Sequence, residues 1–216
     1  MPQTKNTTMP CLPVDIGEFD IFLFGQGKHW DLYRVLGAHP HEGPDGIGYR
    51  FAVWAPNARG VSVTGDFNDW TPGRHTLHPV AASGIWAGFI PGFEKGWLYK
   101  FAVEQKHGGV VEKADPFALC TEMRPGIAAR AWDLDNYVWH DADWMAARRE
   151  KGLPLNDAIS IYEVHPGSWR WKSEEYGSFY SYRDLAESLV PYVRDLGFTH
   201  IEFMPLAEHP LDESWG

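Results

Sequence analysis

Residues 47–138 alternate apolar and polar positions in short runs, each bounded by Gly, Pro, Asn or Asp. A period of two is typical of a β-strand with one buried face, and evenly spaced short strands are typical of an antiparallel sandwich. We therefore predict an all-β, immunoglobulin-like sandwich in this part of the chain. Its expected strands are Gly48–Trp54, Gly60–Gly65, Gly84–Ile90, Trp97–Gln105 and Val110–Ala114, with a further edge strand at Ala129–Trp132.

The pattern changes after the sandwich. A short basic helix is predicted at Asp143–Lys151, and Ala158–His165 is an apolar-rich run typical of a buried parallel strand. Residues 181–197 begin with a Ser-x-x-Asp capping signal and place Leu and Val at helical spacing, with Pro191 expected to kink or break the helix. His200–Pro205 is a second strand. Strand, helix and strand together predict a βαβ unit.

The segment before the sandwich is less regular. Residues 1 to about 14 are rich in Pro and polar side chains and predict a disordered lead-in. Short helices are expected near residues 19–24 and 30–36, followed by a loop over residues 37–44. His39 and His41 in that loop could bind a metal, but no third ligand is nearby. Solvated loop histidines are the better interpretation.

One turn carries candidate binding chemistry. Gly65–Trp70 is dominated by Gly, Asp and Asn, which predict a turn closed by local hydrogen bonds. In the strand at residues 97–103, Trp97, Tyr99 and Phe101 share one face, which we expect to be buried, and Lys100 lies on the opposite, exposed face. Trp70 beside Lys100 would suit a sugar, since the ring stacks on C–H groups and the ammonium donates to hydroxyls. The alternative is that Trp70 only packs under its own turn.

Composition and charge narrow the classes of partner. The 216 residues carry a formal net charge of −10, and no Lys/Arg cluster stands out to neutralise phosphates, so a nucleic acid is a poor partner. Cys11 and Cys120 lack metal-ligand spacing and predict free thiols in a reducing compartment. The N-terminal residues lack the apolar run of a leader or a membrane span. We expect a cytoplasmic protein that uses no metal and no cofactor and does not bind a membrane.

Several motifs carry a resemblance to a known family. Residues 157–169 (DAISIYEVHPGSW) and 196–205 (LGFTHIEFMP), with Glu208-His209-Pro210 and Ser214-Trp215-Gly216, resemble the first two barrel strands of 1,4-α-glucan (glycogen) branching enzymes. Residues 52–58 (AVWAPNA), the Gly65–Trp70 turn, residues 98–101 (LYKF) and residues 113–118 (KADPFA) resemble the α-glucan-binding module that precedes that barrel. The likeness extends over nearly all of residues 19–216.

The resemblance implies a fold and an activity. It implies a sandwich followed by the start of a (β/α)8 TIM barrel, in a transferase that cleaves α-1,4 glucan bonds by retaining chemistry and moves the segment to a 6-hydroxyl. In this family the catalytic carboxylates follow later barrel strands than the two present here, so no residue of this chain inherits a catalytic role. The implied substrate-binding residues are Trp70 and Lys100 on the module, and His209 and Trp215 at the rim of the barrel.

These expectations divide the chain into residues 1–45 (lead-in with short helices), 46–140 (carbohydrate-binding sandwich), 141–155 (helical linker) and 156–216 (first βαβ unit of an incomplete barrel). We expect the chain alone to be inactive, with α-glucan as its partner. Two alternatives remain open. One is a non-catalytic glucan-binding or regulatory protein, and the other is the N-terminal part of a debranching or trehalose-releasing relative.

Overall fold

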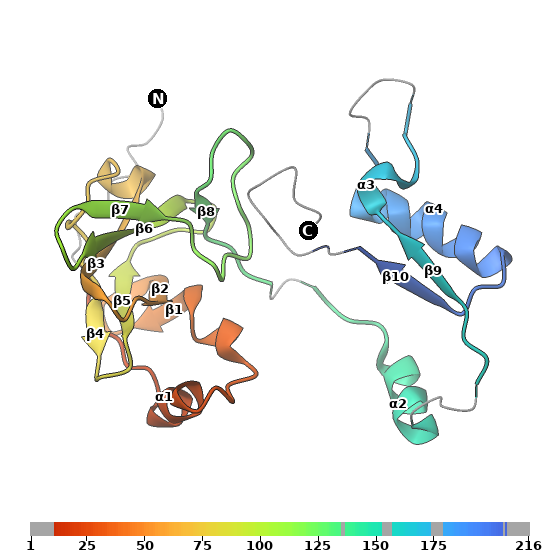
Figure 1. Ribbon diagram of the computed structural model, residues 1–216, viewed down its shortest axis with the longest axis horizontal. Helices are drawn as coiled ribbons and strands as arrows, with labels where there is room; N and C mark the ends of the chain where they lie inside the picture. The colour runs from red at the N-terminus through yellow and green to blue at the C-terminus, as the bar shows by residue number, and fades with distance from the viewer. Residues whose placement is uncertain (1–10, 135–136, 153–156, 174–178, 205, 207–216) are drawn as a thin grey trace. The chain divides into compact units, whose positions relative to one another are not determined.

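The computed structural model describes residues 11–134, 137–152, 157–173, 179–204 and 206 (Figure 1). The chain forms two compact units, one up to residue 136 and the other from residue 137 onwards, and each is described by itself. No helix within the described ranges is long and apolar enough to cross a membrane.

The first unit contains two antiparallel sheets (Figure 1). One sheet has the strand order β1-β2-β5-β4, and the other has the order β3-β6-β7 with β8 paired to β6. Every strand expected from the alternating pattern is present, and two additional strands, β1 and β4, were not expected. The bounds are β1 Gly37–Gly43, β2 Gly46–Trp54, β3 Ala58–Gly65, β4 His78–Val80, β5 Ile85–Pro91, β6 Leu98–Gln105, β7 Val110–Lys113 and β8 Ala129–Arg130.

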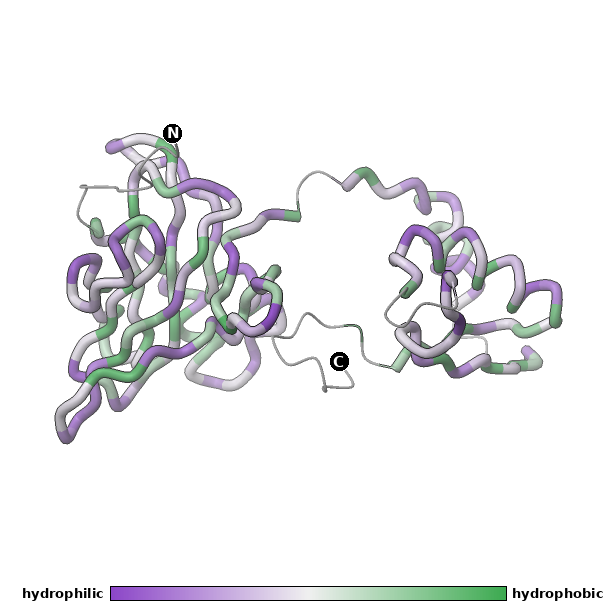
Figure 2. Tube along the Cα trace, turned by 90° about the horizontal axis from the view of Figure 1, so that it is seen from above, coloured by the Kyte–Doolittle hydropathy of each residue, from purple (hydrophilic) through white to green (hydrophobic). Residues whose placement is uncertain are grey.

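The main core of this unit is aromatic. Phe51 from β2, Phe101 from β6 and Phe67 from the turn after β3 are fully buried, and Tyr99 is 1% exposed. Phe51 and Tyr99 meet edge to face with ring centroids 5.1 Å apart, a favoured geometry for aromatic pairs. Figure 2 shows the strands changing between apolar and polar colour along their length, as expected for elements with one buried face.

The predicted register of β6 is confirmed in its central residues. Tyr99 and Phe101 point into the core, and Lys100 lies on the opposite face. Two details of the prediction are wrong. Trp97 precedes β6 and is half-buried at the margin of the core, and Lys100 is half-buried because Trp70 lies against it.

Residues 37–44 are not the loop that we expected. Residues 37–43 form β1, which pairs with β2 from Gly37↔Ala52 to Gly43↔Gly46, so the sheet begins inside residues 1–45, which we expected to be a lead-in with short helices. Pro40 concealed this strand from pattern analysis, because Pro cannot donate to a strand ladder. It is tolerated here because β1 is an edge strand. The other edge, β4, also contains a proline, Pro79, and is only three residues long.

The short N-terminal helices form a layer on the other face of the first sheet. α1 (Glu18–Gly25) and the 3-10 turn Leu32–Arg34 occupy the expected positions. Ile16, Val35 and Leu36 pack with Ala52 and Ala87 of the sheet in a second buried cluster. Leu12 pairs with Phe89 through two backbone hydrogen bonds of 2.7 Å, which ties the chain to β5 well before β1 begins.

The two histidines of β1 are not solvated loop residues. The ring Nε2 of His39 lies 2.8 Å from the carbonyl oxygen of Leu36, and burial lowers the pKa of His39. His41 packs edge to face on Phe89, with ring centroids 4.9 Å apart. No group of three or more metal-ligating side chains occurs among the residues that the structure describes. Both histidines therefore belong to the packing of this sheet.

The second unit is a βαβ arrangement, as predicted. β9 (Ile161–Val164) and β10 (His200–Phe203) pair in parallel, and α4 (Tyr182–Asp195) connects them. Ser181 and Asp184 form a reciprocal capping box at the start of α4. Pro191 does not divide the helix, which runs continuously to Asp195. The unit also contains α2 (Ala142–Lys151) and the one-turn α3 (Pro166–Trp169).

The prediction that the first of these strands is buried is wrong for most of its length. Ile161 is 51% exposed and Val164 is 6% exposed. The small core below the pair is formed by Val164, Leu185, Leu189 and Val193. β9 has one paired neighbour in the described structure, and α4 covers one face, so the other face remains open to solvent.

Candidate sugar-binding site

The candidate site is built on the turn that follows β3. Asn68, which is fully buried, organises this turn. Its Oδ1 accepts from the Gly65 amide at 3.0 Å, its Nδ2 donates to the Val63 carbonyl at 2.9 Å, and Nδ2 also lies 2.9 Å from Nδ1 of His75. A buried amide with these partners fixes the backbone. The turn is therefore a rigid platform closed by local hydrogen bonds, as its Asx-rich sequence predicted.

Gly65 starts the turn because no side chain fits there. A Cβ at this position would lie 2.1 Å from the carbonyl oxygen of Leu98 on β6 and 2.6 Å from a ring carbon of Phe67. The turn thus presses against the neighbouring strand, and Phe67 anchors it from below in the core. This close approach places the residues after Asn68 beside the outer face of β6.

Asp69 and Trp70 both have left-handed backbone conformations, with φ of 54° and 53°. Non-glycine residues avoid this region at a cost of roughly 1–2 kcal/mol each, and a bulky residue there is a clear outlier. Such outliers cluster at functional sites, where the surroundings hold them in place. The backbone at Trp70 is therefore strained, and the surrounding contacts hold it in this conformation.

The structure brings Trp70 and Lys100 together, as the sequence interpretation required. The Lys100 ammonium lies over the indole, 5.5 Å from the ring centroid, within the range of a cation–π contact. The indole Nε1 donates to Asp66 Oδ1 at 2.9 Å, which fixes the orientation of the ring. Both side chains are half-buried. The site therefore combines a held aromatic surface, an ammonium donor and a carboxylate on one patch.

Three polar neighbours of this patch were missed by sequence reasoning, namely Asp66, Glu112 and the fully buried Thr64. Thr64 is the strand partner of Lys100, and its hydroxyl lies 3.2 Å from Glu112 Oε1 on β7. Asp66 was seen only as a turn residue, although it is the acceptor that holds the indole. The Asx-rich composition of the turn was the one feature of the sequence that could have indicated the hydrogen-bonding role of Asp66. Nothing in the sequence indicated that Glu112 and Thr64 meet, since this contact joins β7 to β3 across β6.

The other two candidate residues, His209 and Trp215, lie outside the described residues. The structure therefore has no bearing on their predicted contact with glucan at a barrel rim.

A buried carboxylate in the same unit is structural. Asp115 is 6% exposed, its Oδ2 accepts from the Tyr99 hydroxyl at 2.5 Å, and its Oδ1 accepts from the Phe117 amide at 2.8 Å. Burial raises the pKa of Asp115 to about 6, although both hydrogen bonds act in the opposite direction. Its oxygens face the protein interior, so this group supports the start of the Asp115–Ala118 turn and does not belong to the Trp70 patch.

Comparison with known proteins identifies the class of this module. Residues 35–118 match carbohydrate-binding module 48 (isoamylase N-terminal domain), which includes β1, the turn and Lys100. A maltotriose complex of PulA from Klebsiella pneumoniae has the same fold, with a TM-score of 0.56 at 22% identity over 79% of this chain and 20% of that protein. The chain thus carries a module of the carbohydrate-binding module 48 class.

Relatives with higher sequence identity than PulA are named as enzymes. The chain is 58% identical over 212 residues to the 1,4-alpha-glucan branching enzyme GlgB of Oleidesulfovibrio alaskensis, and 54% identical over 210 residues to that of Nitratidesulfovibrio vulgaris. These matches cover 98% and 97% of this chain and 33% of each enzyme. The resemblance to branching enzymes is therefore shown across nearly the whole chain, which spans about a third of the length of these relatives.

Proposed function

We propose that this chain is the glucan-binding N-terminal part of a 1,4-α-glucan branching enzyme. In this proposal residues 156–216 contain the first βαβ unit of a (β/α)8 barrel, and the parent enzyme forms α-1,6 branches in glycogen in the cytoplasm. The chain itself supplies affinity for α-glucan and no catalytic carboxylate. High identity to branching enzymes over both units supports this assignment over a debranching or trehalose-releasing relative.

The observation that carries the proposal is the Trp70–Lys100 pair. A sugar ring stacks its C–H face on the part of the indole that Lys100 leaves uncovered, and the ammonium donates to the sugar hydroxyls. Asp66 holds the indole through Nε1, so the ring is oriented before a ligand arrives and little side-chain entropy is lost on binding. His209 and Trp215 are proposed as further glucan contacts in the second unit.

Co-sedimentation of the 216-residue protein with glycogen tests the proposal. Trp70→Gly removes the indole, and glycine suits the φ of 53°, so the fold should be retained. We expect Trp70→Gly and Lys100→Met to weaken binding by about tenfold or more. Trp30→Ala, which removes an indole that is 91% exposed elsewhere on the unit, and Lys106→Met are matched controls and should bind like the unmodified protein.

If all four variants are folded by circular dichroism and bind glycogen equally well, the proposal that Trp70 and Lys100 bind glucan is refuted. The non-catalytic alternative makes the same binding prediction. The DNA sequence downstream of Gly216 distinguishes the two proposals. An in-frame continuation that encodes further barrel strands supports the enzyme, and a stop codon after Gly216 in several isolates supports the regulatory protein.

A further inference from the structure

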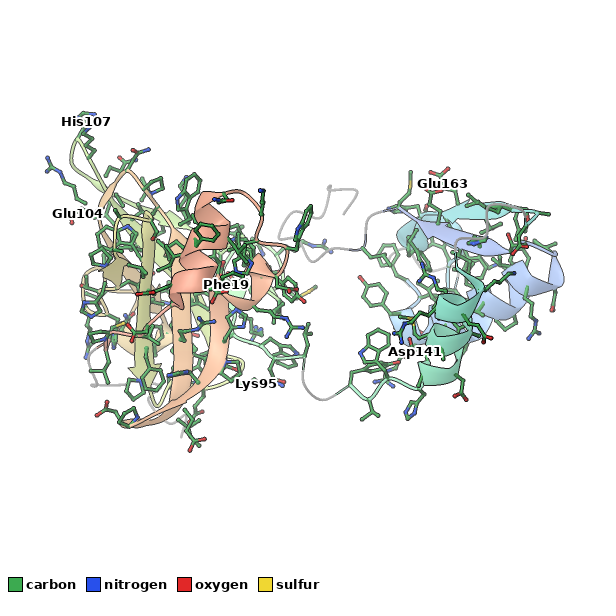
Figure 3. All side chains as sticks on the ribbon, turned by 90° about the horizontal axis from the view of Figure 1, so that it is seen from below. Phe19, Lys95, Glu104, His107, Asp141 and Glu163 are labelled. Carbon is green, nitrogen blue, oxygen red and sulfur yellow. The ribbon has the colours of Figure 1, made fainter. Side chains whose placement is uncertain are left out.

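A groove of about 180 Å³ lies on the outer face of the β3–β6–β7 sheet. Its floor contains Ser62 and Ala102, which are 5% and 2% exposed, and Gly60. Pro72, Gly73 and Thr76 of the loop after the Trp70 turn form one wall, and Glu104 and Val110 form the other. Figure 3 shows Glu104 near the hairpin that carries His107 at its tip.

The groove lies beside the Trp70–Lys100 patch along β3 and β6. Ser62 is two residues from Thr64 on β3, and Ala102 is two residues from Lys100 on β6, so each pair lies on the same face of its strand. Two residues of strand correspond to about 7 Å. The loop wall begins two residues after Trp70. A chain-like ligand that rests on the indole would therefore pass along the strands into the groove.

The loop wall is held in one conformation. The Gly73 amide donates to Ser62 Oγ at 2.8 Å, and the Thr76 hydroxyl donates to the Gly73 carbonyl at 3.1 Å. Residues on either side of Thr76 pair with β3, through Val63 N to His75 O at 2.9 Å and Leu77 N to Val61 O at 2.8 Å. Gly73 has φ of 80°, which glycine adopts without strain. The groove is therefore formed before any ligand binds.

The lining favours a neutral polyhydroxylated ligand. Glu104 offers an exposed carboxylate, Thr76 an oxygen with acceptor capacity, and Ser62 a hydroxyl donor whose oxygen already accepts from Gly73. Pro72 and Val110 provide apolar walls for C–H groups. The lining residues include no Lys or Arg and one carboxylate, so a phosphate or carboxylate ligand would be repelled.

We propose that this groove is a second sugar subsite, which binds a further ring of the α-1,4 glucan whose neighbouring ring stacks on Trp70. This inference rests on the proposed function, because the ligand enters the groove from the Trp70–Lys100 patch. Glu104 and Thr76 accept hydrogen bonds from its hydroxyls, and Val110 and Pro72 contact its C–H faces. The module therefore prefers linear oligosaccharides that are long enough to occupy both positions.

The test is a titration of the ¹⁵N-labelled 216-residue protein with maltose, maltotriose and maltotetraose, with Kd obtained from amide shifts. We expect affinity to rise about tenfold within this series, and the amides of Gly60, Gly73 and Ala102 to shift only with the longer sugars. Glu104→Gln and Thr76→Val should each weaken the longer complex by about three- to tenfold and change maltose binding by less than about twofold. Glu94→Gln, an exposed carboxylate away from the groove, is the matched control.

The outcomes separate the two proposals. If Trp70→Gly abolishes binding while Glu104→Gln and Thr76→Val keep the full gain with sugar length, the groove is not a subsite and the glucan-binding function stands. If affinity does not rise with length in the unmodified protein, the subsite is also refuted. If Trp70→Gly binds as well as the unmodified protein, the proposed function fails, and the groove cannot be the continuation of that site.

Discussion

The buried carboxylate of Asp115 makes a specific prediction about stability and pH. Its pKa is raised from 3.8 to about 6 in the folded protein, chiefly by burial. The native state therefore retains a proton that the unfolded chain has lost at pH values between about 4 and 6. Since stability falls with pH wherever the native state binds more protons, the folded unit loses stability across this window and reaches a plateau above about pH 6.

The expected size of this loss follows from the shift. A shift of about two pKa units corresponds to about 3 kcal/mol of unfolding free energy. Asp115 is 6% exposed, so solvent screening reduces this free energy only slightly. Asp115→Asn removes the titration, at the cost of about 1 kcal/mol for one altered hydrogen bond with Tyr99 or Phe117. The variant should be slightly less stable than the unmodified protein near pH 4 and more stable near pH 7.

Urea unfolding of both proteins from pH 4 to pH 7.5 measures the difference. Because the two units can unfold separately, the transition should be followed by amide resonances of β6, which report on the sandwich alone. Asp15→Asn, at an exposed carboxylate, is the matched control and should parallel the unmodified protein at each pH. A free-energy difference between Asp115→Asn and the unmodified protein that stays constant with pH, or that changes in the opposite direction, would refute the reasoning.

Two further predictions concern the platform and the second unit. Gly65→Ala should destabilise the sandwich by about 3 kcal/mol, because the added Cβ would lie 2.1 Å from the backbone oxygen of Leu98. Gly25→Ala is the control and should be nearly neutral, because a Cβ at that position has nothing within 4 Å. Thermal unfolding of the two variants measures the difference. Limited proteolysis should cut first within residues 152–216, because β9 is exposed over most of its length, with Ile161 at 51%. It should leave a resistant fragment that begins near residue 11, since Leu12 is hydrogen-bonded to Phe89 of β5. Equal resistance of both units, or branch formation on amylose by this chain, would contradict that expectation.

Much of the sandwich could be predicted because its strands alternate clearly. In β6 the aromatic residues Tyr99 and Phe101 occupy every second position, so the pattern and the burial of these two side chains agree. β1 was missed because Gly37, Pro40 and Gly43 are loop signals by composition. Only the pairing with β2 across the Gly43–Gly46 hairpin makes this segment a strand. That pairing is a tertiary effect and leaves no local periodicity.

The candidate site was predictable in part for the same reason. Trp70 and Lys100 stood out as a turn aromatic and an outward lysine, and the structure places them in contact. The left-handed backbone of Asp69 and Trp70 was not predictable, because it depends on Asn68 reaching three groups outside its own position. The groove was invisible in sequence, since its walls come from the loop after Trp70 and from β6 and β7, which meet only when the sheet forms.

The prolines at the two borders of the first sheet have a consequence for self-association. An exposed strand edge can recruit a strand from another molecule, and Pro40 in β1 and Pro79 in β4 each remove a backbone donor from such a border. The strands β9 and β10 contain no proline within their bounds. The β9–β10 pair therefore lacks this protection at both of its edges, and a charged or proline substitution there should reduce self-association without altering the module that holds Trp70.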